Sequence, residues 1–205
     1  MAGKVFFSVS MSLDGFMAPK APEELMGQQW VELQQWLLRT KFLRENLTLK
    51  GGEEGRDNDI ARETFDRTGA SVMGKRMFDA GETMWPENAP FHTPVFVVTH
   101  EKRDPWERPG GTTFHFVQDG IEPALDRARE AAGDRDVRIA GGAETIVEYM
   151  NAGLIDEFST ALSPVLFGSG IRLFDGVDAG RVALEPVRAE PSARVTHLTY
   201  AVRER

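Results

Sequence analysis

Cysteine is absent from this chain of 205 residues. Its absence excludes disulfide bonds, thiolate zinc sites and a cysteine nucleophile. It also fits a reducing compartment, so we expect a cytoplasmic protein, and we assign no metal ligands. No stretch approaches the 18 or more apolar residues of a transmembrane helix, and the first 15 residues lack the apolar run of a signal peptide. We therefore expect no membrane partner.

Basic residues are also in short supply, with 24 Lys and Arg against 32 Asp and Glu and a formal net charge of −8. A nucleic-acid-binding protein needs a basic face, so we expect no nucleic-acid partner. Hydrophobic residues make up 41% of the chain and charged residues 27%, which is typical of a globular protein. An anionic cofactor remains compatible with this charge, because a helix N-terminus binds phosphate through local backbone donors.

The apolar pattern predicts an α/β fold. Strands are predicted at 4–11, 70–73, 94–99, 112–117 and 137–140. Helices are predicted at 25–46, from 75 onward, at 121–132 and from 143 to 150. Strands and helices alternate in the middle of the chain, which indicates a largely parallel sheet. The strand patterns at 155–167 and 194–203 follow one another and predict an antiparallel edge.

A near P-loop occurs where Gly69 is followed, after four residues, by Gly74 and Lys75. The four intervening residues read as a strand rather than a loop, and Arg76 stands where a P-loop needs Ser or Thr for magnesium. A P-loop hydrolase would cleave ATP with magnesium, and we consider it the weakest hypothesis. The alternative is a strand that ends at Gly74 and enters a helix, whose first amides, with Lys75 and Arg76, hold a phosphate.

Two further strand ends support a phosphate site. One carries Gly141 and Gly142 and continues into a helix, without the usual G-x-G-x-x-G fingerprint of dinucleotide sites. The other ends in Thr99 and His100, followed by two cations. Two glycine turns on one sheet can grip the two phosphates of a dinucleotide. The hydroxyl, the imidazole and the cations suit a ribose 2′-phosphate, which favours NADPH over NADH.

Five segments carry a family resemblance. They are SVSMSLDGFMA (8–18), VMGKRMF (72–78), PVFVVTH (94–100), RIAGGAETI (138–146) and IDEFSTALSPVLFGSGIRLF (155–174). Together they resemble the dihydrofolate reductase fold, and more closely the reductase domain of riboflavin biosynthesis and its stand-alone relatives. The resemblance implies a three-layer α/β/α fold, with a mostly parallel central sheet and an antiparallel C-terminal edge strand. It also implies a homodimer.

The sequence shows no clear domain boundary. We expect one reductase-like domain over 1–205, in which 20–58 is a possible insertion that could cover the active site. The zinc deaminase domain that often accompanies this reductase needs cysteine ligands, so we expect no deaminase half in this chain.

The resemblance also implies site residues. Substrate would contact Ser12, Leu13 and the tight turn with Gly168 and Gly170. The cofactor would contact Met17 and Ala18 at the nicotinamide, Thr99 and His100 at the adenosine ribose, and the phosphate turns formed by Gly74, Lys75 and Arg76 and by Gly141, Gly142, Ala143, Glu144 and Thr145. One departure is Met77, where the family often has threonine, and it weakens the preference for NADPH.

Two carboxylates are candidates for the catalytic acid. Counting back about 16 residues from Gly74, as in dihydrofolate reductases, leads to Asn58, beside Asp57 and Asp59. A buried acid there could bind a pterin-like ring and help to protonate it. Asp59 is equally a helix N-cap candidate, and the rival acid, Asp14, lies in an Asp-Gly turn pair.

Aromatic side chains could place a flat substrate by stacking. Trp85 and Phe16 are the candidates, although Trp85 also reads as a loop residue that caps the core.

The sequence therefore favours an NADPH-dependent reductase that transfers hydride to a small heterocyclic substrate, such as a ribosylamino-pyrimidine or a pterin-like ring. Two other hypotheses stay open. The first is a nucleotide-binding module of reductase fold without turnover, which would bind cofactor but not oxidise it. The second is a flavin- or folate-binding protein, which would purify with a coloured or absorbing ligand.

Overall fold

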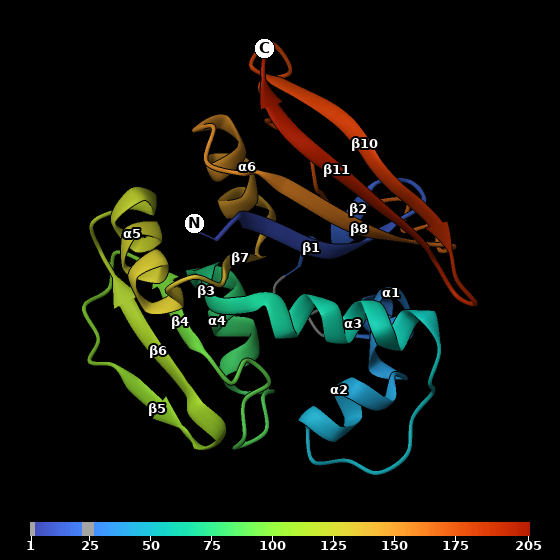
Figure 1. Ribbon diagram of the computed structural model, residues 1–205, viewed down its shortest axis with the longest axis horizontal. Coiled ribbons are helices and arrows are strands. Elements are labelled where there is room, and N and C mark those ends of the chain that lie inside the picture. Colours follow the sequence, from blue (N-terminus) through green and yellow to red (C-terminus); the bar gives the residue numbers. More distant parts are fainter. Residues whose placement is uncertain (1–2, 22–26) are drawn as a thin grey trace.

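A computed structural model describes residues 3–21 and 27–205. One large twisted sheet runs through the molecule, with helices on both faces (Figure 1). Its strands lie in the order β10 (Val182–Pro191), β11 (Thr196–Glu204), β8 (Glu157–Ser163), β1 (Val5–Ser12), β7 (Asp136–Gly141), β3 (Thr68–Gly74), β4 (Pro94–Val98), β6 (Thr112–Val117) and β5 (Trp106–Arg108). Two short strands, β2 (Phe16–Ala18) and β9 (Ile171–Arg172), pair separately.

The direction of the strands confirms the predicted fold class. All neighbours from β8 through β1, β7, β3 and β4 to β6 are parallel. Antiparallel pairs occur at the two edges, where β11 joins β8 and β10, and where β5 joins β6. Strands β5 and β10 are absent from the sequence prediction. Most of their residues are exposed or half-buried, so neither carries a clear alternation of buried and exposed positions.

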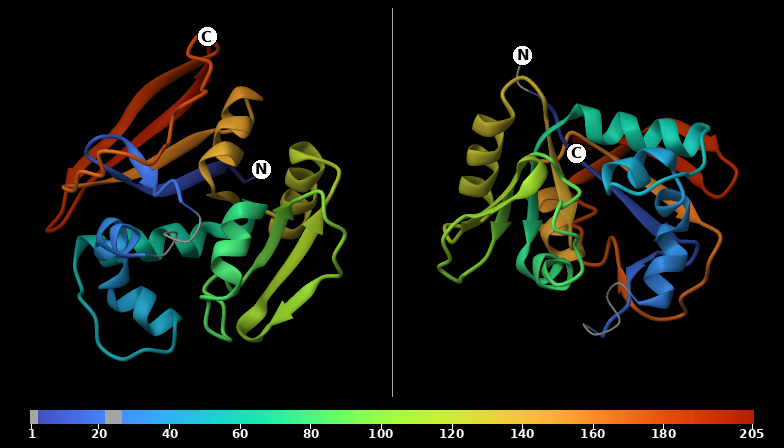
Figure 2. Two further views of the ribbon diagram at one scale, coloured as in Figure 1. Left: turned by 180° about the vertical axis from the view of Figure 1, so that it is seen from behind. Right: turned by 90° about the horizontal axis from the view of Figure 1, so that it is seen from below.

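Helices cover both faces of the sheet (Figures 1 and 2). On one face, α5 (Ile121–Ala132) and α6 (Ala143–Asn151) bury their apolar sides over β1, β3, β4 and β7. The Tyr149 hydroxyl joins these two helices by donating to the Ile121 carbonyl at 2.6 Å. On the other face lie α1 (Gln28–Leu38), α3 (Arg56–Arg67) and α4 (Lys75–Glu82), and α2 (Lys41–Asn46) packs against α3.

Strand alternation decides what each face receives. In β7, Val137 and Ile139 are buried in the apolar core that includes α5 and α6. Arg138 and Ala140 therefore point to the opposite face, beneath α3 and α4. A charged side chain is thus placed on the inner face of a central strand, a position where such residues are rarely unpaired.

Three predicted elements are wrong in their bounds. The helix expected at 25–46 is two helices, because the Thr40 side chain accepts the Leu43 N–H and caps the start of α2; residues 25 and 26 lie outside the described residues. Asp59 is not an N-cap, because α3 begins at Arg56 after Gly55, which leaves Asp59 exposed in the first turn. The strand expected at 155–167 ends at Ser163, directly before Pro164.

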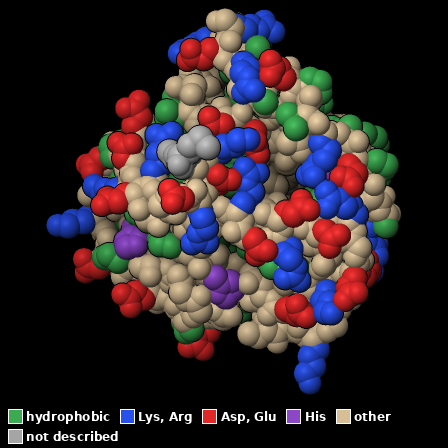
Figure 3. Space-filling model, viewed as in Figure 1, with side chains coloured by type: hydrophobic (Ala, Val, Ile, Leu, Met, Phe, Trp, Pro, Cys, Tyr) green, Lys and Arg blue, Asp and Glu red, His purple; other side chains and the backbone are tan. Residues whose placement is uncertain are grey.

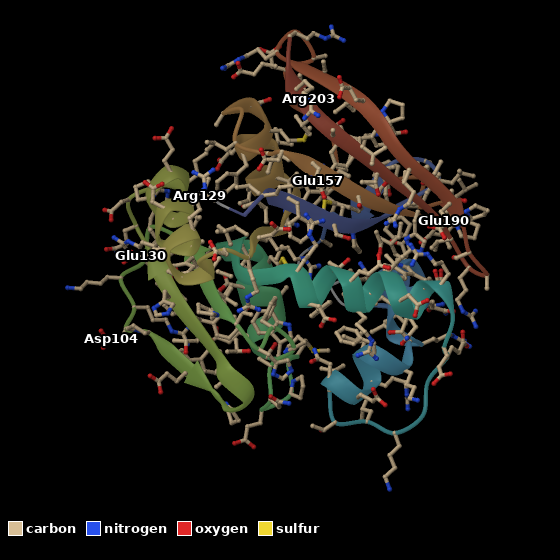
Figure 4. The ribbon with its side chains drawn as sticks, in the orientation of Figure 1. Asp104, Arg129, Glu130, Glu157, Glu190 and Arg203 are labelled. Atoms are coloured by element: carbon tan, nitrogen blue, oxygen red, sulfur yellow. The ribbon has the colours of Figure 1, made fainter. Side chains whose placement is uncertain are left out.

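Ion pairs connect the ends of the layers, and two of their acidic partners, Glu157 and Glu190, are labelled in Figure 4. Arg67, the last residue of α3, donates to Asp136 and Glu157 at the starts of β7 and β8. Burial alone would raise the pKa of Glu157, but hydrogen bonds from Lys4 and Arg67 outweigh it and lower this pKa. At the other end of α3, Arg56 pairs with Glu190 of β10 at 2.7 Å.

The charges elsewhere are dispersed. Acidic and basic side chains alternate over the face shown in Figure 3 and form no broad basic area there. None of the helices in the described part of the chain combines the length and apolar character needed to cross a bilayer.

Candidate functional site

A cavity of about 1080 Å³ opens where β3, β4 and β7 end. In parallel sheets, ligands bind at the carboxyl ends of the strands. Helices α1, α2, α3 and α4 each contribute to the wall. Of the residues that the sequence predicts for the site, the wall contains Met17, Ala18, Gly74, Lys75, Arg76, Trp85, Thr99, His100, Gly142, Ala143, Glu144, Thr145 and Gly170.

The two predicted glycine turns lie next to each other. Strands β3 and β7 are neighbours, with Met73 opposite Gly141, so the turn at Gly74 meets the turn at Gly142. Gly74 precedes α4 and Gly142 precedes α6, and neither helix start has a side-chain cap. The first amides of both helices therefore stay available to an anion. Gly141 is not part of the cavity wall, although it joins Gly142 by a cis peptide bond.

Two cationic side chains, Lys75 and Arg76, line this end of the cavity. Lys75 Nζ donates to Asp79 at 2.6 Å and lies 3.2 Å from Glu101. The hydrogen bond to Asp79 is the main reason that the pKa of Lys75 is raised. Arg76 Nη2 donates to the Lys20 carbonyl at 2.7 Å. Both cations are held in place, so a phosphate bound here would share Lys75 with carboxylates.

The strand end after β4 supplies a buried hydroxyl and an exposed imidazole. Thr99 Oγ1 accepts the Glu101 N–H at 3.0 Å, which shapes the turn. His100 is exposed at the rim of the cavity. Contact of these two residues with an adenosine ribose stays a prediction.

The far end of the cavity is built mainly from residues that sequence reasoning missed. Trp36 Nε1 donates to Ser10 Oγ at 2.9 Å, and Ser10 Oγ donates to Gln34 Oε1 at 2.8 Å. All three residues line the cavity. Their positions in an alternating strand and on one side of a predicted helix were the only available signal. Behind them, His197 contacts the Trp36 ring edge-on at 4.9 Å and pairs with Asp57 at 2.7 Å.

Arg138 is a second residue that sequence reasoning missed. Its guanidinium lies 5.2 Å from the Phe65 ring centre, and Nη2 donates to the Ser8 carbonyl at 3.2 Å. All three residues line the cavity. Burial lowers the pKa of Arg138 to about 10, so the side chain stays charged at neutral pH. An arginine inside the apolar strand VRIAGG was the sequence signal for it.

Several predicted residues lie away from the cavity. The Asp14 carboxylate accepts a hydrogen bond from Ser12 Oγ of its own turn at 2.6 Å. It also accepts hydrogen bonds from the amides of Phe167 and Gly168, which belong to a distant segment of the chain. The Ser12 hydroxyl is the largest of the contacts that lower the pKa of Asp14 to about 2. Leu13 is exposed on another surface. Asp14 therefore shapes a turn, and neither it nor Ser12, Leu13 and Gly168 lines the cavity.

The candidate acids of α3 also lie outside the cavity wall. Asp59 is exposed and does not line the cavity. Asn58 turns away to accept the Phe42 N–H at 2.7 Å, and Asp57 pairs with His197. The catalytic assignments of Asp14 and Asp59 are therefore not supported by their positions.

The aromatic candidates divide. Trp85 stacks on Phe114, with ring centres 5.1 Å apart, and also forms part of the cavity rim. Phe16 is buried beside Leu33 and Phe167 and is not part of the cavity wall. Only Trp85 is therefore placed to contact a ligand.

The mostly parallel sheet and the cavity at its strand ends are those of a dihydrofolate reductase-like α/β protein. A family model, the RibD C-terminal domain, matches residues 3–198. The chain belongs to the RibD C-terminal domain family. Family and fold together support a reductase.

Relatives and solved structures agree with this fold. The uncharacterized protein YyaP of Bacillus subtilis is 25% identical over 198 residues, which cover 96% of this chain and 94% of YyaP. A candidate riboflavin biosynthesis protein from Shewanella sp. PV-4 superposes with a TM-score of 0.65 at 22% identity, covering 98% of this chain and 99% of that one. Dihydrofolate reductase from Enterococcus faecalis, complexed with NADP(H), gives 0.54 at 15% identity over 98% of both chains.

Proposed function

We propose that this protein is an NADPH-dependent reductase of a small heterocyclic substrate, such as a ribosylamino-pyrimidine or a pterin-like ring. The observation that carries the proposal is the pair of adjacent glycine turns, Gly74 and Gly142, each followed by an uncapped helix start in one cavity wall. Nearby Lys75 and Arg76 add positive charge. Such an arrangement suits two linked phosphates.

The residues present fit the cofactor. Thr145 fills the place that a Cβ at position 74 would take, so this glycine lets the two turns pack against each other. Nothing lies within 4 Å of a Cβ position at Gly142, so the backbone there is open to close approach by phosphate. Thr99 and His100 would hold the adenosine ribose and its 2′-phosphate, and Met17 and Ala18 would border the nicotinamide. Bound NADPH supplies the hydride.

The chain's own contribution is orientation and the exclusion of water. The cavity, at about 1080 Å³, exceeds the size of a drug-like ligand site, so it has room for a dinucleotide and a ring substrate. We propose that α1 and α2, which belong to segment 20–58, form the cover over the substrate. Holding two reactants in register can remove several kcal/mol from a barrier, up to roughly 7–11 in the best model systems.

Protonation of the substrate needs a source other than Asp14 or Asp59. Ser10 and Gln34 are the hydrogen-bonding side chains that line the substrate end near Trp36. We assign the proton to a water molecule that these two side chains orient. We keep the homodimer and the cytoplasmic location as predictions.

The test is a titration of the purified protein with NADPH and with NADH, followed by quenching of tryptophan fluorescence. Trp30, Trp36 and Trp85 line the cavity, so a bound dinucleotide should quench them. We expect micromolar binding of NADPH and weaker binding of NADH. Absence of binding by either cofactor would refute the proposal.

A second candidate function is a nucleotide-binding module without turnover. It is favoured by the absence of Asp14, Asp57 and Asp59 from the cavity wall. The same preparation separates the two, because a module binds NADPH but shows no oxidation with pterin or ribosylaminopyrimidine substrates.

A further inference from the structure

Among residues 3–21 and 27–205, the charge of Arg138 has no ionic partner. In the described part of the chain no carboxylate offsets it, and burial is the only influence on its pKa. Its Nε atom is buried without a hydrogen-bond acceptor. Among the described residues, the one acceptor that it reaches is the neutral Ser8 carbonyl, at a long 3.2 Å. A buried charge is costly unless it is paired, so this side chain is held in an unfavourable state.

The exposed part of Arg138 belongs to the cavity. The residue is half-buried and lines the wall together with Phe65 and Ser8. It lies apart from the phosphate turns, because three steps of extended chain, about 10 Å at 3.3 Å per residue, separate it from Gly141 at the end of β7. Its position on β7, between β1 and β3, places it near the middle of the sheet.

We propose that Arg138 binds a singly charged, planar oxyanion of the substrate, either a carboxylate or the ionised oxygen of an acidic imide ring. This inference rests on the proposed reductase function and names the substrate class of that site. One guanidinium matches one negative charge, and its flat donors suit a planar acceptor. The dianion of a phosphate would leave one charge uncompensated beside the Phe65 ring.

The same side chain argues against a pterin that is bound through a carboxylate. A ring bound through a donor-rich edge needs an acceptor such as a carboxylate, but Asp57 of α3 pairs with His197 and Asp59 is exposed outside the cavity wall. Here the floor carries a cation instead. The ring that binds should therefore present an electron-rich oxygen at this position rather than a donor-rich, cationic edge.

The experiment measures binding of small probes to the NADPH-saturated protein by calorimetry. Benzoate and benzamide form a matched pair, since they share ring and size and differ in charge. Barbiturate represents the acidic imide, and inorganic phosphate the excluded dianion. We expect benzoate or barbiturate to bind at least about tenfold more tightly than benzamide and phosphate, and the stronger of the two identifies the source of the oxyanion.

Substitution then tests the residue. In Arg138→Met the preference should fall to less than about twofold, and Arg138→Lys should retain part of it. The matched control is Arg129→Met, which removes an exposed arginine from α5 on the opposite face (Figure 4) and should leave the preference unchanged. Equal binding of benzoate and benzamide by the wild type, or a preference that survives in Arg138→Met, would overturn the assignment.

A structural role makes a different prediction for the free protein. If Arg138 only supports the fold, Arg138→Met should lower Tm. If its charge awaits a ligand, removing it should leave Tm unchanged or raise it, because an unpaired buried charge disappears. NADPH binding should be the same in all variants. If the wild type does not bind NADPH, the proposed reductase function is refuted. If the wild type binds NADPH but shows no preference for the anionic probes, only the role of Arg138 is refuted.

Discussion

The hydroxyl of Thr145 occupies the space that a Cβ on Gly74 would need. The two residues belong to different glycine turns, one after β3 and one after β7, and Gly142 N lies 3.9 Å from the same position. The turns therefore interlock, and neither can shift without the other. A glycine at position 74 follows from packing and not from backbone strain, since its φ of −78° suits any residue.

Gly74→Ala should push the two turns apart. Overpacking of this kind costs about 1–3 kcal/mol, and the displaced amides should also weaken NADPH binding. Thr145→Ala removes the overlapping hydroxyl, so the double variant should regain stability relative to the sum of the single changes. A double-mutant cycle by urea unfolding measures this coupling. Additive losses would show that the contact between the two turns is not the cause.

Lys75→Ala should weaken NADPH binding by about tenfold to a hundredfold, because a hydrogen bond to a charged group contributes about 1.5–3 kcal/mol. Asp79→Asn should act in the opposite direction, since Asp79 is the nearer of the two carboxylates that compete for Lys75. The matched control is Lys102→Ala, an exposed lysine that does not line the cavity. Fluorescence titration at low salt compares the variants, and equal affinities for all would exclude Lys75 from the phosphate site.

Asp14→Asn should destabilise the protein in a pH-dependent way without loss of catalysis. The carboxyl pKa is lowered from 3.8 to about 2 in the folded state, chiefly by Ser12. A lowered pKa means that the stabilisation is complete above pH 3.8 and disappears as the pH falls toward 2. The Tm deficit of Asp14→Asn should therefore be constant near neutrality and shrink between about pH 4 and 2. Asp104→Asn changes an exposed acid and serves as the control. Abolished reduction at pH 7 in Asp14→Asn would restore its catalytic role.

Much of the fold follows from periodicity. The segments 70–73, 94–99 and 137–140 are apolar runs between helical patterns, and they form the buried strands β3, β4 and β7. Hydrophobic spacing could not show that a helix breaks at Thr40, because apolar residues continue on both sides and only a local side-chain hydrogen bond marks the cap. The edge strand β10 was not predicted because most of its side chains face solvent, so its sequence shows no alternation of apolar and polar residues.

Part of the candidate site could also be predicted from the sequence, and part could not. Glycine turns and the residues that follow them could be predicted, because glycine at a strand end has a local meaning. The proposed substrate end could not be predicted, because Ser10, Gln34 and Arg138 come from three distant segments and share no motif. Counting residues from Gly74 reached α3, which lines part of the cavity, yet it could not tell which side of the helix faces the cavity. In the structure Asp59 is exposed, and Asp57 points to His197.

Asp57→Ala should destabilise the protein, whereas Asp59→Asn should not. Asp57 and Asp59 lie in the same first turn of α3, but Asp57 is the hydrogen-bond partner of His197, whose side chain is only 3% exposed. Leaving a buried polar group without its partner costs about 1–3 kcal/mol, while an exposed change such as Asp59→Asn stays within about 0.5 kcal/mol. Urea unfolding compares the two variants.

Because His197 supports Trp36, which in turn holds Ser10, Asp57→Ala should also raise KM for the reducible substrate and leave NADPH affinity unchanged. A wild-type stability for Asp57→Ala, or a loss of reduction in Asp59→Asn, would contradict this account of α3.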